Sequence, residues 1–290
     1  MNKNKYFLES FMKYIFLICA LISVISIIFI CYFIFQGGVP FILEYGIGDF
    51  ILGTEWKPSN SVPQYGVLPM IWGSVYTTLL ACIIGIPIGI LTAAYLAKSA
   101  KKSVYKFLKP ALNLMAGIPS IVYGFFALVV IVPLIRNLFG GQGASILAAG
   151  LLLAIMILPT IVSLSEAAIR AVPRSYYEGS LALGATHERS LYKVVLPAAK
   201  SGIFASIVLG IGRAIGETMA VVLIAGQQPR VTYDITKGIR TLTTNVVLEM
   251  AYAQGQHREA LFASAVLLFI FILIINTALF VFKKRGMAND

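Results

Sequence analysis

The chain has 290 residues, of which 59% are hydrophobic and 12% are charged, and its mean hydropathy is +0.87. Soluble globular domains carry roughly twice that share of charged residues, so the composition excludes a soluble domain and indicates a polytopic membrane protein. The formal net charge is +11, but the basic residues cluster in short segments beside apolar runs, which argues against a nucleic-acid-binding surface.

Six apolar segments are long enough to cross a membrane, and they predict an all-α fold with six transmembrane helices. Each has about 20 or more mainly apolar residues, and at about 1.5 Å per residue such a helix spans the hydrocarbon core. The segments are 14–36, 70–97, 110–135, 144–165, 201–226 and 261–282. The third contains Pro110, Pro119 and Pro133, so we expect it to be bent or broken.

The first apolar run follows basic residues, as the apolar core of a secretory signal peptide does. The run 14–35 is nevertheless too long for a signal peptide and long enough to span. We therefore interpret it as a retained anchor helix.

Basic residues fill alternate loops between the spans, and this asymmetry predicts the orientation. Four clusters hold 16 of the 23 Lys and Arg residues; they precede the first span and follow the second, fourth and sixth. The clusters are Lys3, Lys5 and Lys13; Lys98, Lys101, Lys102, Lys106 and Lys109; Arg170, Arg174, Arg189, Lys193 and Lys200; and Lys283, Lys284 and Arg285. By the positive-inside rule both termini are cytoplasmic.

With this orientation, the chain divides into three parts. An N-terminal anchor helix and outer loop occupy 1–69, a core of five helices with a cytoplasmic segment at 166–200 occupies 70–283, and a cytoplasmic tail occupies 284–290. The outer loops 36–69 and 227–260 are long, and each is either an ordinary solvated loop or a docking surface for an external partner.

Cysteine and histidine show no metal-binding pattern. Cys19, Cys31 and Cys82 lie inside apolar stretches, without a second cysteine at metal-ligand spacing, and His187 and His257 each stand alone. We expect no metal and no cofactor, and interpret the cysteines as small hydrophobic residues.

Arg213 and Glu217 lie in a segment that is otherwise apolar from 203 to 225. On insertion scales an ionisable side chain at the centre of a bilayer costs about 2.5–3.5 kcal/mol, so these two charges mark a candidate functional site. Small residues, which allow close helix packing, recur every four positions beside them. The two stripes are Gly202, Ser206, Gly210 and Ala214, and Gly212, Gly216 and Ala220. We expect the charges to face protein or an aqueous pathway rather than lipid.

The segment between the fourth and fifth spans is too polar to cross the membrane and predicts two short helices. Ser175 and Glu178 form a capping box that would begin the first, and Gly184 suits its C-terminal end. Thr186 can cap the second, which Pro197 would end before the fifth span.

This segment resembles the EAA loop of ABC importer permeases. Glu178 and Gly184 stand at the family spacing, followed after nine residues by Val194, Val195, Leu196 and Pro197. The chain departs from the motif at Gly179 and Ser180, where the family has two alanines, and at Val194, where it has isoleucine. In that family the loop is a coupling helix that docks on a cytoplasmic ATPase. The resemblance implies ATPase coupling by Tyr177, Glu178, Leu181, Gly184, Leu196 and Pro197; the alternative is that Glu178 only caps its helix.

Two further stretches, 116–124 and 212–221, are similar to the permeases of phosphate-specific ABC importers, in particular the PstC type. The shorter stretches 54–58 and 65–69 agree. The related PstA type usually has Ala-Pro after Gly-Glu-Thr, where this chain has Met219, Ala220 and Val221. The resemblance covers about residues 50 to 283.

This resemblance implies the transmembrane domain of a type I ABC importer in the bacterial plasma membrane. Its expected partners are a second, PstA-like permease, two PstB-like ATP-binding subunits and an external PstS-like phosphate-binding protein. The chain itself has no Walker A sequence and so no P-loop for ATP hydrolysis. We therefore expect a transport subunit rather than an enzyme.

Phosphate is a hydrated anion that needs compensating charge to cross hydrocarbon. The guanidinium of Arg213 can bond two phosphate oxygens at once. Glu217 either neutralises Arg213 one helical turn away or accepts a hydrogen bond from a phosphate hydroxyl, which sulfate lacks. Thr218 and Ser206 can add neutral hydrogen bonds. A purely structural ion pair remains an alternative.

Other functions also fit parts of the pattern. An ABC permease for molybdate, sulfate or phosphonate keeps the same class, whereas a self-sufficient anion channel or carrier would not need the cytoplasmic docking segment. A membrane enzyme is a further possibility, but the sequence shows no recognisable catalytic constellation.

Overall fold

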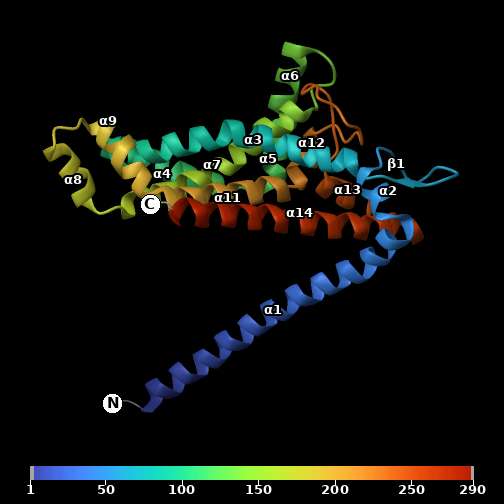
Figure 1. Cartoon of the computed structure of the whole chain (residues 1–290), viewed down its shortest axis with the longest axis horizontal. Helices are drawn as coiled ribbons and strands as arrows, with labels where there is room; N and C mark the ends of the chain where they lie inside the picture. Colours follow the sequence, from blue (N-terminus) through green and yellow to red (C-terminus); the bar gives the residue numbers. More distant parts are fainter. Residues whose placement is uncertain (1–2, 289–290) are drawn as a thin grey trace.

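The computed structural model describes residues 3–288, which form a bundle of long helices (Figure 1). The centre consists of α3 (Leu68–Ala94), α7 (Ile146–Ala171) and α11 (Lys200–Gly216), and α14 (Gly255–Ala288) runs beside them. Helix α7 packs along both α3 and α11. The structure confirms the all-α prediction, since the described residues contain only one short strand pair.

Helix α1 (Lys3–Tyr45) leaves the bundle at an angle (Figure 1). It contacts α14 near its C-terminal end, where a Cβ on Gly38 would lie 2.7 Å from the backbone nitrogen of Ala263. The apolar stretch of α1 is otherwise unburied. The predicted anchor is thus part of a longer helix whose apolar surface only lipid or another membrane subunit can cover.

The third predicted span, 110–135, is wrong in its bounds, although the expected break is confirmed at Pro119. Helix α4 (Lys102–Gly117) ends before this proline, which removes a backbone donor and favours an extended preceding residue. The membrane-spanning segment is 120–139 instead. It consists of α5 (Ser120–Phe126), a π-helical turn η2 (Ala127–Ile131) and α6 (Val132–Phe139).

The fifth predicted span is interrupted as well. Helix α11 ends at Gly216, two residues follow, and the short α12 (Met219–Ile224) completes the segment. Five helical segments of the described chain are each long and apolar enough to span. The segments His187–Ala198 and Lys200–Gly216, which meet at a bend of 71°, give a sixth candidate span when they are counted together.

The cytoplasmic end carries the short helices between the fourth and fifth spans, and α1 begins and α14 ends on the same side (Figure 1). These elements are α8 (Arg174–Ala182), α9 (His187–Ser190), the π-helical turn η3 (Leu191–Val195) and α10 (Leu196–Ala198), next to the π-helical end of α3, η1 (Tyr95–Ser99). The prediction that both termini lie on one side of the membrane agrees with this arrangement, because the first and last described residues, Lys3 and Ala288, lie at the same end of the bundle.

The local predictions for Thr186 and Gly184 in this segment are confirmed. Thr186 caps α9 by accepting a hydrogen bond from the Arg189 amide at 3.3 Å, and Gly184 follows α8 with a φ of +85°. The capping box of Ser175 and Glu178 is wrong, because Ser175 already lies inside α8, which begins at Arg174 after Pro173 without a side-chain cap. A proline at that position sets the backbone dihedral for the turn into the helix without a side-chain hydrogen bond.

The outer end is an ordered cap. It contains α2 (Ile47–Leu52), the antiparallel strands β1 (Trp56–Lys57) and β2 (Gln64–Tyr65), and α13 (Leu242–Glu249). The buried Glu249 joins both outer loops: it accepts hydrogen bonds from Trp56 Nε1 at 2.8 Å and from Arg240, and its Oε2 lies 2.8 Å from His257 Nε2. The loops are therefore more than solvated connections, and an external docking role stays a prediction.

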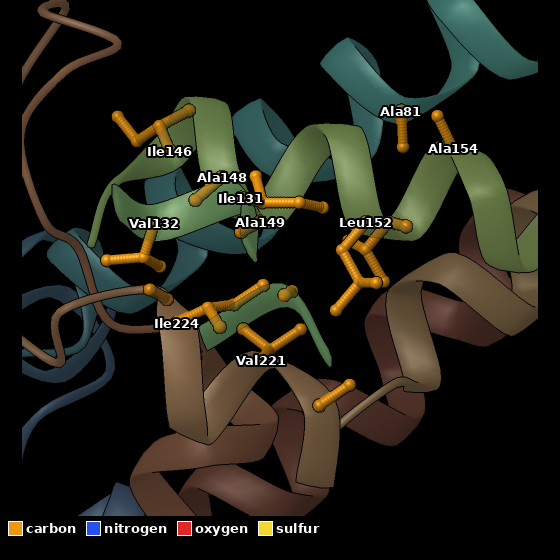
Figure 2. Close-up of a cluster of buried hydrophobic side chains, with 14 of the residues drawn as sticks. Ala81, Ile131, Val132, Ile146, Ala148, Ala149, Leu152, Ala154, Val221 and Ile224 are labelled. Carbon is orange, nitrogen blue, oxygen red and sulfur yellow. The ribbon is translucent and has the colours of Figure 1, made fainter. Parts of the chain in front are cut away.

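A hydrophobic cluster holds the short α12 in place (Figure 2). Val221 and Ile224 of α12 point into the same cluster as Ile131 and Val132, and α7 contributes Leu152. All five side chains are buried. A six-residue helix has little intrinsic stability, so this tertiary packing is what keeps α12 helical.

Candidate translocation and coupling sites

The break in the fifth span is built around Glu217. Its backbone is extended, with φ −69° and ψ 128°, which ends α11. Its carboxylate Oε1 accepts a hydrogen bond from the Ala220 amide at 3.2 Å, at the N-terminal turn of α12. A carboxylate in that position satisfies a free backbone donor and suits the helix dipole. The Glu217 carboxylate thus caps the N-terminal turn of α12.

Arg213 lies in the last turn of α11 and is partly buried. The predicted contact with Glu217 across one helical turn is wrong, because the helix ends between the two residues. Among the described side chains, no hydrogen bond or ion pair to the Arg213 guanidinium is found. The last turn of α11 therefore carries a permanent positive charge without a neutralising partner among the described side chains.

The stretch 212–221, which contains Arg213, and the stretch 116–124 contact each other in the folded chain. Tyr123 donates its hydroxyl proton to the Met115 carbonyl at 2.9 Å, which bridges the break between α4 and α5. Next to it, a Cβ on Gly124 would lie 2.8 Å from the Cα of Ala220. Helices α5 and α12 thus touch backbone to backbone, and the residues 116–124 and 212–221 form one unit.

Polar groups from a third element line the same break. Thr243 of α13 donates a hydrogen bond to the Glu217 carbonyl at 3.2 Å, and Thr218 donates one to the Gly216 carbonyl at 3.1 Å. These bonds satisfy carbonyls that the end of α11 leaves without helical partners. Thr243 was not predicted, although the nearby Thr241, which caps α13 and forms a capping box with Thr244, is a signal in the sequence.

Ser206 lies apart from this break. It is fully buried between α11 and α7, where it hydrogen-bonds to Ser165 at 2.7 Å and to the Ile203 carbonyl. On the same stripe Gly202 packs on Ala168, which confirms the predicted close approach. A contact of Ser206 with substrate stays a prediction.

The second predicted stripe of small residues is wrong as a continuous packing face. Gly212 and Gly216 have open space around them in the described chain, and Ala220 belongs to the separate helix α12. The interruption of the helix at residues 217 and 218 changes the direction of the backbone. Residues four positions apart on the two sides of it therefore no longer share one helix face.

In the coupling segment, Tyr177 faces the bundle. Its hydroxyl lies 2.6 Å from His187 Nδ1, while His187 Nε2 lies 3.0 Å from the Ser99 hydroxyl. The ammonium group of Lys98 lies 5.4 Å from the centre of the Tyr177 ring. The imidazole, which the sequence showed only as an isolated histidine, therefore ties α8 to the cytoplasmic end of α3.

The outward side of α8 is exposed. Glu178 and Gly184 are exposed, Leu181 is half-exposed, and Leu183 is 91% exposed. Leu183 was missed by sequence reasoning, although an apolar residue directly before the C-terminal glycine of a polar segment is a usable signal. Exposed apolar side chains on a cytoplasmic helix favour a protein partner.

The remaining predicted coupling residues, Leu196 and Pro197, lie at the bend before α11. Leu196 packs against a buried cluster with Val195 and Leu191, and Pro197 is exposed. Both lie where the cytoplasmic segment with α8 and α9 joins the fifth span. Their role in coupling stays a prediction.

No group of three or more His, Cys, Asp or Glu side chains within residues 3–288 is arranged to hold a metal ion. The candidate sites are therefore the Arg213 break and the exposed side of α8.

Comparison with known proteins gives matches over most of the chain. Residues 85–285 match the family model of the binding-protein-dependent transport system inner membrane component. The chain is 39% identical to the probable ABC transporter permease protein YqgH of Bacillus subtilis, with 89% of this chain and 86% of that protein covered. It is 32% identical to the phosphate transport system permease protein PstC of Haemophilus influenzae, with 92% and 90% covered.

Solved structures share the fold at low sequence identity. The alginate ABC transporter, solved with a periplasmic protein that holds an alginate pentasaccharide, has a TM-score of 0.65 at 15% identity and covers 92% of each chain. The inward-facing MetNI methionine ABC transporter has a TM-score of 0.61 at 21% identity and covers 76% of this chain and 95% of its own. Together with the matched family model, these observations show that the chain belongs to the binding-protein-dependent transport system inner membrane components, the multi-pass permease subunits of ABC transporters.

Proposed function

We propose that this chain is the membrane-spanning permease subunit of an ATP-driven importer of inorganic phosphate. Relatives named as phosphate permeases support phosphate as the substrate. The observation that supports anion binding is Arg213, which has no ion-pair partner among the described side chains and lies where the fifth span is interrupted. A broken helix at membrane depth is tolerated where it lines a cavity or faces protein.

Arg213 would hold phosphate for a short time during transport. A guanidinium is permanently charged and its fork matches two phosphate oxygens. Binding at this point has to be weak, because a permease that held phosphate tightly could not release it. High affinity then belongs to an external phosphate-binding protein, a partner that would deliver substrate to the outer cap.

Glu217 would add discrimination rather than affinity. Its Oε1 is engaged by the Ala220 amide, while Oε2 has no hydrogen bond among the described residues. That oxygen can accept a bond from the hydroxyl of hydrogen phosphate. Sulfate has no hydroxyl at neutral pH, so it would meet a carboxylate oxygen without a donor at the break in the fifth span, and this repulsion opposes its passage.

ATP hydrolysis would take place on two partner subunits, one of which would dock on α8. The exposed Leu181, Leu183 and Glu178 supply the contact surface, and the His187 bridge to α3 supplies a rigid connection to the bundle. A second, similar permease would complete the pathway and cover the apolar surface of α1. Alternating access then consists of two packings of the helices whose populations ATP binding shifts.

The test is phosphate uptake by the assembled transporter in proteoliposomes, with Arg213→Lys compared with the unchanged protein. Loss of a bidentate charged hydrogen bond is worth about 1.5–3 kcal/mol, so we expect uptake to fall roughly tenfold or more. Arg136→Lys is the matched control, because Arg136 is an exposed outer residue that bonds the Gln142 carbonyl. Unimpaired uptake by Arg213→Lys in a correctly assembled transporter would contradict the proposed site.

A further inference from the structure

A cavity of about 400 Å³ opens at the cytoplasmic end of the bundle, between η1, α4 and α7. Its walls carry Lys98, Lys102, Lys106 and Arg170, together with the ring of Tyr105. We call this cavity the basic pocket. It is separate from the Arg213 break and from the exposed side of α8, and the transport chemistry above does not use it.

Arg170 is paired with Glu166, whereas the three lysines of the basic pocket have no carboxylate partner in the described part of the chain. None of the described residues that line it is an aspartate or a glutamate. Among residues 3–288, no ion pair to Lys98, Lys102 or Lys106 is found. Three lysines without a carboxylate partner repel each other around one cavity, so a bound anion would stabilise the arrangement.

Arg170 is held in a fixed position at the wall of the pocket. Its Nε donates to Glu166 Oε1 at 2.8 Å and its Nη2 donates to the Leu96 carbonyl at 2.8 Å. The guanidinium carbon lies 4.8 Å from the centre of the Tyr105 ring. Nη1 makes no hydrogen bond within the described chain, so a preorganised donor remains for a ligand.

Helix α4 places the pocket at the level of the lipid headgroups. Lys102 and Lys106 lie on one side of α4, whereas Phe107 and Leu114, on another side, are more than 70% exposed. A helix with an exposed apolar side and a row of lysines, directly after a span, is typical of the membrane interface. Basic pockets at the cytoplasmic surface suit phosphate-bearing lipid headgroups.

We propose that the basic pocket binds a phosphate group at the cytoplasmic surface of the membrane. The headgroup of an anionic phospholipid and free inorganic phosphate carry the same chemistry, and both reach this side. Because the ammonium of Lys98 also contacts the Tyr177 ring of α8, an anion in the pocket changes the charge next to the coupling helix. The site therefore links the surrounding phosphate groups to the segment that docks the ATPase.

The experiment measures the reactivity of individual lysines in the assembled transporter with an amine-reactive reagent, read by peptide mass spectrometry. Three nanodisc samples are compared at equal ionic strength: phosphatidylcholine alone, phosphatidylcholine with phosphatidylglycerol, and phosphatidylcholine with inorganic phosphate. Lys13 and Lys193, exposed cytoplasmic lysines outside the pocket, are the internal controls.

We expect a phosphate group in the pocket to slow labelling of Lys98, Lys102 and Lys106 about fivefold relative to the controls. Slowing with phosphatidylglycerol alone assigns the site to lipid, and slowing with inorganic phosphate alone assigns it to the free anion. Lys102→Gln combined with Lys106→Gln should then abolish the protection of Lys98, whereas Lys13→Gln combined with Lys193→Gln should keep it.

Two results would overturn the proposal. Equal slowing at the pocket lysines and at the control lysines would show only a general surface potential. Pocket lysines that react alike in all three samples, or stay unreactive in all of them because a protein subunit covers them, would show that neither the anionic phospholipid nor inorganic phosphate binds there. Because labelling is measured on the unchanged protein, a variant that fails to assemble does not prevent either conclusion.

Discussion

Gly124 of α5 lies directly against Ala220 of α12, so close that a Cβ on the glycine would be 2.8 Å from the Cα of the alanine. This contact joins the two broken spans of the permease. Because α12 is held by such contacts and by the cluster around Val221 and Ile224, the Arg213 break depends on packing between segments that are far apart in the sequence.

Gly124→Ala should therefore separate α5 from α12. The added methyl group meets backbone, which cannot rotate away, and such overpacking costs about 1–3 kcal/mol. We expect a lower unfolding temperature of the purified transporter and reduced uptake. Gly117→Ala is the control, because a Cβ there meets nothing within 4 Å. Equal stability of the two variants would show that the close approach is unimportant.

Two substitutions at Glu217 separate its structural role from its effect on selectivity. Glu217→Ala removes the acceptor for the Ala220 amide and should lower stability by about 1 kcal/mol. Glu217→Gln keeps an acceptor oxygen, so its unfolding temperature should stay near that of the unchanged protein, while sulfate becomes a better competitor of phosphate uptake. Unchanged sulfate competition in Glu217→Gln would leave only the capping role.

Leu183→Asp should disrupt docking of the ATPase subunit without unfolding the permease, because this side chain is almost fully exposed. A well-packed apolar anchor contributes about 2 kcal/mol or more to an interface, so the amount of ATPase that copurifies should fall more than tenfold. Val62→Asp, at an exposed apolar residue of the outer cap, is the matched control. Undiminished copurification of the ATPase would place the docking surface elsewhere.

The buried Glu166 joins two helices at the cytoplasmic end. It accepts hydrogen bonds from Lys109 Nζ and Arg170 Nε, each at 2.8 Å. Glu166→Gln removes the charge and leaves two partly exposed cations, so we expect a loss of about 1–3 kcal/mol in thermal unfolding measurements. Glu55→Gln breaks an exposed pair with Lys57 and should change stability by less than about 1 kcal/mol. Similar effects of both variants would contradict the importance of burial.

One of the two helix interruptions in the spans was predictable from the sequence and the other was not. Pro119 predicted a break in the third span because proline lacks a backbone donor, and the break occurs there. No proline or other local signal marks the break at Glu217 and Thr218. That interruption depends on a hydrogen bond from Thr243 and on packing against α5, and neither partner is near in sequence.

In the coupling segment, too, local contacts were predictable from the sequence and long-range contacts were not. Thr186 and Gly184 act through neighbouring backbone groups, so local rules predicted them. His187 appeared isolated because its partners Tyr177 and Ser99 are 10 and 88 residues away, and only the folded chain brings them together.

The sequence by itself determined the membrane class, the all-α fold and the cap at Thr186, because hydropathy and short-range hydrogen bonding depend on residues that are close along the chain. Tertiary structure decided that Arg213 and Glu217 are not paired, that Ser206 lies between helices, and that four cations surround one cytoplasmic pocket. Those relationships depend on where a helix ends and which element packs beside it, and long-range packing is not encoded in any local pattern.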